Sequence, residues 1–224
     1  MLKKFSGLQM AIDYILDTIF PIHCLSCRKQ NEIVCEKCLD DITLNEITDR
    51  NYIYSSYSYK DKLMKKIIWN LKYYNKKDLG IFFGQILYRN YIEEINELRL
   101  FNLGQSVLVI PVPLSKKRQK DRGYNQAQVI ANGFCNQANT DVLELQKDTV
   151  VKTRDTIPQA HIKNKRNRLN NARGVYKIIN PSIVKNRNII IIDDVTTTGG
   201  TIDEIKKLLE KAGARKVIGI TIAH

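Results

Sequence analysis

Two adjacent carboxylates, Asp193 and Asp194, precede a turn rich in threonine and glycine, residues 196–201. Such a turn can surround an anion, because glycines let the backbone approach closely and threonine hydroxyls donate hydrogen bonds. The carboxylates cannot bind a phosphate directly, but they can accept hydrogen bonds from paired hydroxyls or help to hold a hydrated divalent cation. Phosphate donors beside acceptors for a vicinal diol indicate a site for a 5-phosphorylated ribose.

A strand and a helix must position these groups. Four consecutive isoleucines, residues 189–192, form an unbroken β-branched run, which is typical of a strand buried on both faces of a parallel sheet. After the turn, an apolar stripe at helical spacing ends before Gly213, a C-cap signal. Backbone N–H groups and the positive end of the helix dipole would then meet at the turn. A buried strand followed by an ordinary loop is the alternative.

Other phosphate-binding loops fit this stretch less well. The sequence has neither a G-x-x-x-x-G-K-[ST] motif nor a G-x-G-x-x-G fingerprint. The segment instead resembles the phosphoribosyl-pyrophosphate signature of type I phosphoribosyltransferases. This resemblance implies that Asp193 and Asp194 are the candidate catalytic residues. It also implies that the ligand is bound by these two and by Val195, Thr196, Thr197, Thr198, Gly199, Gly200 and Thr201.

Four cysteines near the N-terminus form two C-x-x-C pairs, Cys24 with Cys27 and Cys35 with Cys38. Two such pairs can place four thiolates around one tetrahedral Zn²⁺, and we expect a structural zinc site. The separation between the pairs is short for a zinc ribbon, so the module would be minimal. Redox-active C-x-x-C chemistry is the alternative, and a disulfide framework is a weaker explanation in a lysine-rich chain without a signal peptide.

Two basic segments follow later in the chain. The first comes after a buried strand predicted over residues 106–113 and can bind a pyrophosphate or a nucleic-acid backbone, although an isolated charge run is more often a solvated loop. Its candidate ligand-binding residues are Ser115, Arg118 and Arg122, and its candidate nucleic-acid contacts are Lys116, Lys117 and Lys120. The second segment, residues 155–173, has few apolar residues, so we expect it to be mobile, and a lid that closes over an anionic ligand is one use for it. Its candidate nucleic-acid contacts are Lys163, Lys165, Arg166 and Arg168.

Composition limits the class of protein. The 224 residues carry a net charge of +13, which attracts polyanions such as nucleic acid, although a solvated lysine-rich surface is the simpler explanation. No apolar run reaches the ~20 residues that span a bilayer, so we expect no membrane insertion. Residues 1–20 read as an amphipathic helix of a cytoplasmic protein. The length accommodates a zinc-binding module over residues 1–52 and a larger domain over 53–224.

The remaining pattern predicts alternating strands and helices. Residues 51–60 alternate aromatic and small polar side chains, as in a half-buried strand, although tyrosines among lysines can also stack on bases. Residues 61–74 predict a helix with Leu63, Ile67 and Leu71 inward and its lysines, Lys72 included, outward. A second helix is predicted over 80–100 and another through about residue 138. Further strands are predicted over 148–154, 174–178 and 217–223, the last closing the sheet.

Three segments together resemble the ComF competence-protein family. The first runs from Pro111 through Arg118 and Arg122 to the Gly123–Ala127 stretch. The second contains Arg154, Thr156, Gln159, Arg168, Asn171, Gly174 and Tyr176, and the third is the Asp193–Thr201 stretch. Ser115 stands where the family often has histidine, and Tyr124 replaces a common phenylalanine.

The resemblance implies an α/β fold, the type I phosphoribosyltransferase fold, in which helices flank a Rossmann-like parallel sheet, with a small N-terminal zinc ribbon of four cysteines. It implies binding of phosphoribosyl pyrophosphate with Mg²⁺, and a role in handling single-stranded DNA during natural transformation beside a competence helicase. It does not supply an acceptor substrate. An active phosphoribosyltransferase of nucleobase or amine metabolism, with no DNA role, is the alternative.

Overall fold

The computed structural model describes residues 22–45, 50–102, 104–153 and 174–224. The predicted N-terminal amphipathic helix, the second basic segment with Lys163, Lys165, Arg166 and Arg168, and the earlier residues of the second family segment lie outside the described residues. The chain divides into two compact units, Met1–Ile42 and Thr43–His224. The domain boundary at residue 52, drawn from the sequence, stays a prediction.

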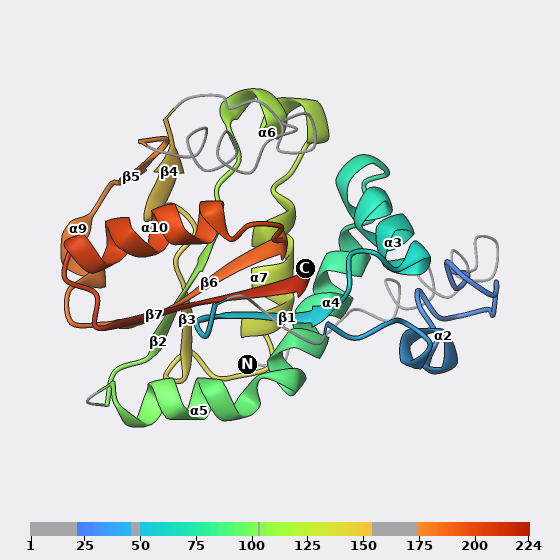
Figure 1. Ribbon diagram of the computed structural model, residues 1–224, viewed down its shortest axis with the longest axis horizontal. Coiled ribbons are helices and arrows are strands. Elements are labelled where there is room, and N and C mark those ends of the chain that lie inside the picture. Colours follow the sequence, from blue (N-terminus) through green and yellow to red (C-terminus); the bar gives the residue numbers. More distant parts are fainter. Residues whose placement is uncertain (1–21, 46–49, 103, 154–173) are drawn as a thin grey trace, which may run out of the picture. The chain divides into compact units, whose positions relative to one another are not determined.

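The larger unit is built on a five-stranded sheet with the order β1-β7-β6-β2-β3, and every neighbouring pair in it is parallel (Figure 1). The isoleucine run forms β6 at the centre, as the sequence predicts. The strands are β1 (Ile53–Tyr57), β2 (Val107–Pro111), β3 (Leu143–Leu145), β6 (Asn188–Val195) and β7 (Lys216–Ala223). A separate antiparallel pair joins β4 (Val150–Lys152) to β5 (Tyr176–Ile178).

Helices connect the parallel strands, as parallel pairing requires. In the larger unit they are α3 (Lys62–Tyr73), α4 (Lys77–Asn90), α5 (Ile92–Leu100), α6 (Lys116–Arg122), α7 (Gln126–Cys135), α9 (Pro181–Val184) and α10 (Gly200–Lys211). The smaller unit contains α2 (Glu36–Asp40). None of the described helices is long and apolar enough to cross a membrane.

The isoleucines of β6 contribute buried side chains to both faces of the sheet. Ile189 and Ile191 belong to a buried cluster with Ile205 and Leu209 of α10, the helix that runs alongside β6 and β7 in Figure 1. Successive strand side chains point to opposite faces, so Ile190 and Ile192, which are also fully buried, face the other layer. On that side α7 packs on β6 and β2, and α4 packs on α7.

Two glycines set the distance between α4 and α7. A Cβ atom at Gly84 would collide with the carbonyl oxygen of Ile130, and one at Gly133 would collide with that of Ile81. The helix backbones therefore touch through positions that exclude any side chain. This contact fixes α7 against the sheet, and α7 begins directly after the first basic segment.

Four sequence-based expectations are corrected. The single helix expected over 80–100 is two helices, α4 and α5, which meet at Tyr91. The basic segment expected as a loop is the helix α6, because the Ser115 side chain caps its start and Gly123, at φ +77°, ends it. The final strand, β7, does not close the sheet, because β1 pairs with its outer edge. Lys72 does not face outward but is largely buried.

Candidate functional site

The first basic segment and the acidic pair lie at the same edge of the sheet. Strands β2 and β6 pair in parallel, with Pro111 opposite Ile192, and the Val112 N–H donates to the Ile192 carbonyl at 2.9 Å. Both strands therefore end side by side, and the segments that follow them start from one place. Ligands of open parallel sheets bind outside the carboxyl ends of the strands, so this edge is the candidate site.

Backbone hydrogen bonds fix the acidic pair. Oδ1 of Asp193 accepts from the Asp194 N–H at 2.8 Å, and Oδ1 of Asp194 accepts from the Val195 N–H at 2.7 Å. Asp194 is buried, and its Oδ2 lies 2.9 Å from Nζ of Lys72 on α3. The two carboxylates therefore differ, because Asp194 has a cation within contact distance and Asp193 keeps more of its capacity for a ligand.

The surroundings shift the pKa values of these groups. Burial and the adjacent charge of Asp194 raise the pKa of Asp193 to about 7, although backbone hydrogen bonding, Lys72 and Lys152 oppose the shift. Burial alone would lower the pKa of Lys72, but the attraction and hydrogen bond of Asp194 outweigh it and raise that pKa. Asp193 therefore changes charge near neutral pH, whereas Lys72 stays a cation.

The turn after β6 is held in shape by its own groups. The Thr196 hydroxyl accepts from the Gly199 N–H at 3.2 Å, and the Thr196 N–H donates to the Ala223 carbonyl at 3.0 Å. Gly199 caps α10 at φ +70°, a left-handed conformation that favours glycine. Among the described residues, Thr198 Oγ1 is buried without a hydrogen-bond partner. The turn thus presents an unpaired hydroxyl at the N-terminus of a 12-residue helix.

A polar cluster supports the first turn of α10 from the β1 side. The Tyr52 hydroxyl donates to Asp203 Oδ1 at 2.7 Å, and Arg50 forms an ion pair with the same carboxylate. A Cβ atom at Gly199 would come within 2.9 Å of Ile53 and 3.1 Å of Arg50. Together with the left-handed backbone at Gly199, these contacts favour glycine at this turn.

The neighbouring strand end carries the cations. Ser115 Oγ accepts from the Arg118 N–H and starts α6, in which Lys116, Lys117 and Lys120 are exposed and Arg118 and Arg122 are partly buried. Asn125 starts α7, accepting from the Ala127 N–H and donating to the Val112 carbonyl at 3.0 Å. Between the two helices, the Tyr124 hydroxyl donates to the Leu71 carbonyl of α3. The position where the family often has phenylalanine therefore connects this segment to the helix that carries Lys72.

The β4–β5 pair adds two groups that act on the acidic pair. Lys152 of β4 partly offsets the rise in the pKa of Asp193. Tyr176 of β5 hydrogen-bonds to Thr201, and its own pKa is raised by the charge of Asp193 and lowered by that of Arg118. Burial is the main reason that the pKa of Tyr176 is raised, so its hydroxyl stays protonated. Groups from α3, β4 and β5 thus join the site although they are distant from residue 193 in the sequence.

The structure brings together part of the predicted site. The acidic pair, the 195–201 turn and the segment from Ser115 to Arg122 share one edge of the sheet, whereas Lys163, Lys165, Arg166 and Arg168 lie outside the described residues. Sequence reasoning assigned no role to Lys72, Lys152 or Tyr176 in this site. Only Tyr176 had a signal, as one position of the family resemblance.

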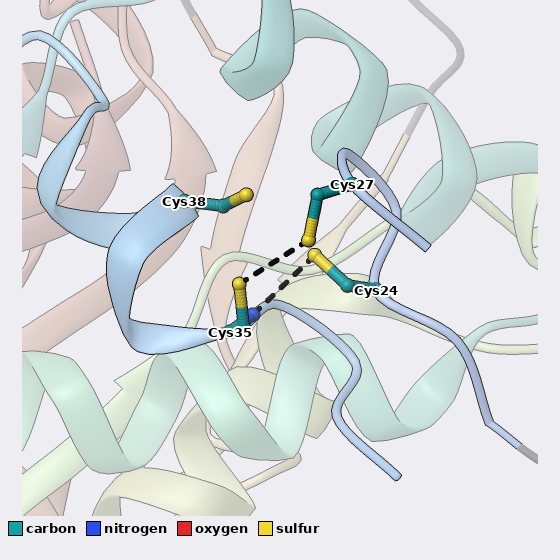
Figure 2. Close-up of side chains that lie close together, drawn as sticks. All are labelled: Cys24, Cys27, Cys35 and Cys38. Atoms are coloured by element: carbon teal, nitrogen blue, oxygen red, sulfur yellow. Dashed lines mark hydrogen bonds between the residues drawn. The ribbon is translucent and has the colours of Figure 1, made fainter. Parts of the chain in front are cut away.

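The four cysteines gather in the smaller unit, as Figure 2 shows. Their sulfur atoms all lie within 4.8 Å of one another, and the Cys27 and Cys35 sulfurs are 3.5 Å apart. Tetrahedral Zn–S bonds of about 2.3 Å would separate neighbouring sulfurs by about 3.8 Å, so the cluster fits a zinc ion. Burial opposes ionisation of Cys24, but N–H donors led by that of Cys35 lower the pKa of its thiol to about 6. The cluster could therefore hold a metal.

A family model and several known proteins match this chain. The family model described as "Phosphoribosyl transferase domain" matches residues 120–224. DNA utilization protein YhgH of Shigella flexneri is 28% identical over 154 residues, which cover 69% of this chain and 64% of that protein. Competence protein ComFC of Streptococcus pneumoniae is 32% identical over 140 residues, or 62% of this chain and 55% of that protein. The chain therefore spans less than two thirds of the length of these relatives.

Among solved structures, hypoxanthine-guanine phosphoribosyl transferase of L. donovani aligns with a TM-score of 0.39 and 9% identity, covering 65% of this chain and 67% of that chain. The fold itself rests on the sheet: the five parallel strands and flanking helices, with the domain match, confirm the predicted type I phosphoribosyltransferase fold. This domain match, the relatives named for competence and DNA utilization, and the four-cysteine cluster make the chain similar to the ComF-like family.

Proposed function

We propose that the protein binds phosphoribosyl pyrophosphate with Mg²⁺ at the edge formed by β2 and β6, and that it handles single-stranded DNA during natural transformation. The observation that carries the first part is the buried, unpartnered hydroxyl of Thr198 at the N-terminus of α10, a few residues after the acidic pair. Buried polar groups are rarely left unpaired, and a helix N-terminus favours an anion. A 5-phosphate bound in the turn would satisfy both.

The ligand's parts match the chemistry of the two strand ends. With the 5-phosphate at the turn of residues 196–201, the ribose hydroxyls donate to Asp193 and Asp194. The pyrophosphate then extends toward α6, where Arg118 and Arg122 can form charge-assisted hydrogen bonds with it. Tyr176, whose pKa is affected by the charges of Asp193 and Arg118, would border the bound ligand on the β5 side.

The residues also suit the metal. Mg²⁺ prefers oxygen ligands, keeps several waters, and is commonly held by one or two carboxylates together with substrate phosphates. Asp193 and Asp194 supply carboxylate oxygens of that kind, and Lys72 already offsets one of the two negative charges. Bound there, Mg²⁺ would neutralise charge on the pyrophosphate and favour its departure.

The DNA role rests on the names of the relatives and on charge. Proteins named for DNA utilization and for competence match this chain, and its net charge is +13. Single-stranded DNA, a competence helicase as partner and a cytoplasmic location are all parts of this proposal. The exposed lysines of α6, Lys116, Lys117 and Lys120, support contact with a phosphate backbone.

Calorimetry with phosphoribosyl pyrophosphate and Mg²⁺ tests the ligand. Wild type should bind, and Thr198→Val should weaken binding by about 10- to 150-fold, because a hydrogen bond to a charged group is worth roughly 1.5–3 kcal/mol. Thr198→Ser keeps the hydroxyl and serves as the matched control. Equal affinities for the Val and Ser variants would show that the phosphate does not lie in this turn.

The same preparation separates the proposal from its alternative. In a phosphoribosyltransferase of nucleobase or amine metabolism, an acceptor displaces pyrophosphate from ribose C1, and the released pyrophosphate can be assayed. Release with a base or amine, together with no binding of single-stranded DNA at low salt, would favour that alternative. DNA binding without such turnover supports a protein that uses the fold for binding, since fold does not fix function.

We further propose that Cys24, Cys27, Cys35 and Cys38 bind one structural Zn²⁺. Metal analysis of gently purified protein should then find one zinc per chain. Removal with a chelator should unfold the smaller unit, because so small a module has little core of its own. Disulfides between these cysteines in the purified protein would instead support the redox alternative.

A further inference from the structure

One face of α3 is both aromatic and basic. Trp69, Tyr73 and the following Tyr74 are 55%, 56% and 62% exposed. The other strongly exposed aromatic side chain of the described residues, Phe101, follows α5 beside the exposed Leu100 and has no second exposed ring next to it in the chain. Large apolar side chains exposed as a group indicate an interaction surface, whereas single ones are ordinary.

The rings of Trp69 and Tyr73 pack against each other, and a guanidinium group lies over Tyr73. The ring centroids of Trp69 and Tyr73 lie 4.4 Å apart, and Cζ of Arg122 lies 5.3 Å from the centroid of Tyr73. The opposite side of α3 is anchored in the core by Met64, Ile67, Ile68 and Leu71. Tyr73 is therefore held between a cation and Trp69, and it supports Trp69 at the surface.

The charge around these rings is positive. Lys62, Lys65 and Lys66 precede Trp69 on α3 and are exposed, and Lys76 and Lys77 follow Tyr74 and are exposed as well. The sequence of α3, KLMKKIIWNLKY, contains no acidic residue. Because Lys62, Lys66, Trp69 and Tyr73 recur at intervals of three or four residues, they share one helix face. This face is the aromatic–basic face of α3.

We propose that the aromatic–basic face of α3 binds single-stranded DNA, with bases stacked on Trp69 and the backbone held by the lysines. This goes beyond the ligand site and rests on the DNA part of the proposed function. The combination of cations with exposed rings fits a strand whose bases are unpaired, since duplex DNA hides its base faces. An acidic protein would also be attracted by the lysines, but successive unpaired bases on a charged backbone match both the rings and the lysines of this face.

Trp69 is the only tryptophan of the 224 residues, so its fluorescence reports on this surface alone. Oligo(dT) should quench it, whereas an abasic strand of the same length should bind more weakly and leave it largely unchanged. Equal quenching by both strands would mean that no base stacks there and would overturn the proposal.

Affinity for labelled oligo(dT), measured by anisotropy, gives the second test. Trp69→Ala should weaken binding by roughly 5- to 150-fold, the range expected for one stacked base, and leave its salt dependence unchanged. Trp69→Phe, which keeps a ring, should restore most of the affinity, and Phe101→Ala should have no effect. Lys65→Gln with Lys66→Gln should instead reduce the salt slope by about 0.7 for each phosphate that the two lysines neutralise in wild type.

The outcomes distinguish this inference from the function on which it rests. If wild type binds oligo(dT) and Trp69→Ala binds it equally well, the DNA role survives but the face serves another partner, and the inference is wrong. If wild type fails to bind oligo(dT) at low salt, both are wrong. Binding of phosphoribosyl pyrophosphate, measured in parallel, shows that the protein is folded in either case.

Discussion

The ends of β6 and β2 are neighbours in the sheet and differ in almost every other respect. At β6 the functional groups are two carboxylates held by backbone N–H groups, followed by a glycine turn on which Ile53 and Arg50 pack. At β2 they are cations on α6, a helix of seven residues with no buried residue of its own. One strand end is rigid and acidic, and the other is exposed and basic.

This difference indicates that the two strand ends recognise different parts of the ligand. Groups that accept from ribose hydroxyls must be placed accurately, because hydrogen bonds weaken steeply with poor geometry. Groups that attract a pyrophosphate act over longer distances and can belong to a more adjustable element. We therefore expect substitutions at β6 to affect every ligand that contains ribose 5-phosphate, and substitutions in α6 to affect only ligands with a pyrophosphate.

The largest effect is expected at β6. Asp193→Asn together with Asp194→Asn removes two hydrogen bonds to charged acceptors, worth roughly 1.5–3 kcal/mol each, so affinity should fall by about two to four orders of magnitude. The fall should be similar for phosphoribosyl pyrophosphate and for ribose 5-phosphate, as calorimetry can show. Affinity for single-stranded DNA should hold or rise slightly, because the substitutions remove negative charge.

A control is needed because Asp194 also pairs with Lys72. Neutralising Asp194 alone leaves a largely buried ammonium without its partner, which destabilises a protein. Adding Lys72→Met to the double variant removes that charge, and thermal unfolding of both forms shows whether the fold is retained. Unchanged affinity for both ligands in a folded variant would contradict the assignment of the acidic pair.

The next effect is expected at β2. Arg118→Gln removes one charge-assisted contact to the pyrophosphate and should weaken phosphoribosyl-pyrophosphate binding by about 10- to 150-fold. Ribose 5-phosphate, which lacks the pyrophosphate, should bind as it does to wild type. Lys117→Gln removes an exposed charge of the same helix and serves as the control for net charge. Equal losses of affinity for the two ligands would show that the strand ends do not act separately.

The same two regions show what the sequence could predict. The signals for β6, its turn and α10 are contiguous: a β-branched run, two acids, glycines and an apolar stripe. The location of the basic segment after β2 was also visible, but its helical form was not. Without buried residues α6 has no apolar periodicity, and only the Ser115 cap and the left-handed Gly123 reveal it.

Contacts between distant parts of the chain could not be read from the sequence. Lys72 looks like its exposed neighbours Lys65 and Lys66, and only the packing of α3 brings its ammonium to Asp194. Strand β3 was not predicted, and its place in the sheet depends on its pairing with β2, more than thirty residues earlier in the chain. The break between α4 and α5 at Tyr91 has no proline or glycine to mark it.

A further effect concerns the pH dependence of stability and of ligand binding. Because the pKa of Asp193 is raised from 3.8 to about 7, the folded protein keeps a proton that the unfolded chain releases between those values. The free energy of unfolding without ligand should therefore decrease as pH rises through this window, by at most about 1.4 kcal/mol per pH unit. Ligand affinity should increase over the same window, because the ionised carboxylate is the better acceptor.

Asp193→Asn distinguishes this group from the ligand's own phosphates. Without ligand, the variant should lose the fall in stability between about pH 4 and 7. Its affinity for the ligand should keep only the pH dependence that arises from the ligand's own phosphates. Arg118→Gln should keep the wild-type profile, since guanidinium groups stay charged throughout. Chemical denaturation at several pH values measures the stability, and a wild-type profile in Asp193→Asn would show that another group titrates.

The smallest effect separates two threonines of the β6 turn. The Thr196 hydroxyl accepts from the Gly199 N–H, whereas the buried Thr198 hydroxyl has no partner among the described residues. Thr196→Val should therefore lower the free energy of unfolding by about 1 kcal/mol, a decrease in Tm of about 2–4 °C. Thr198→Val should leave Tm unchanged or raise it slightly, because it removes an unsatisfied group. Thermal unfolding without ligand measures both. Equal decreases of Tm would mean that the Thr198 hydroxyl stabilises the empty turn, and the case for a phosphate as its missing partner would then fail.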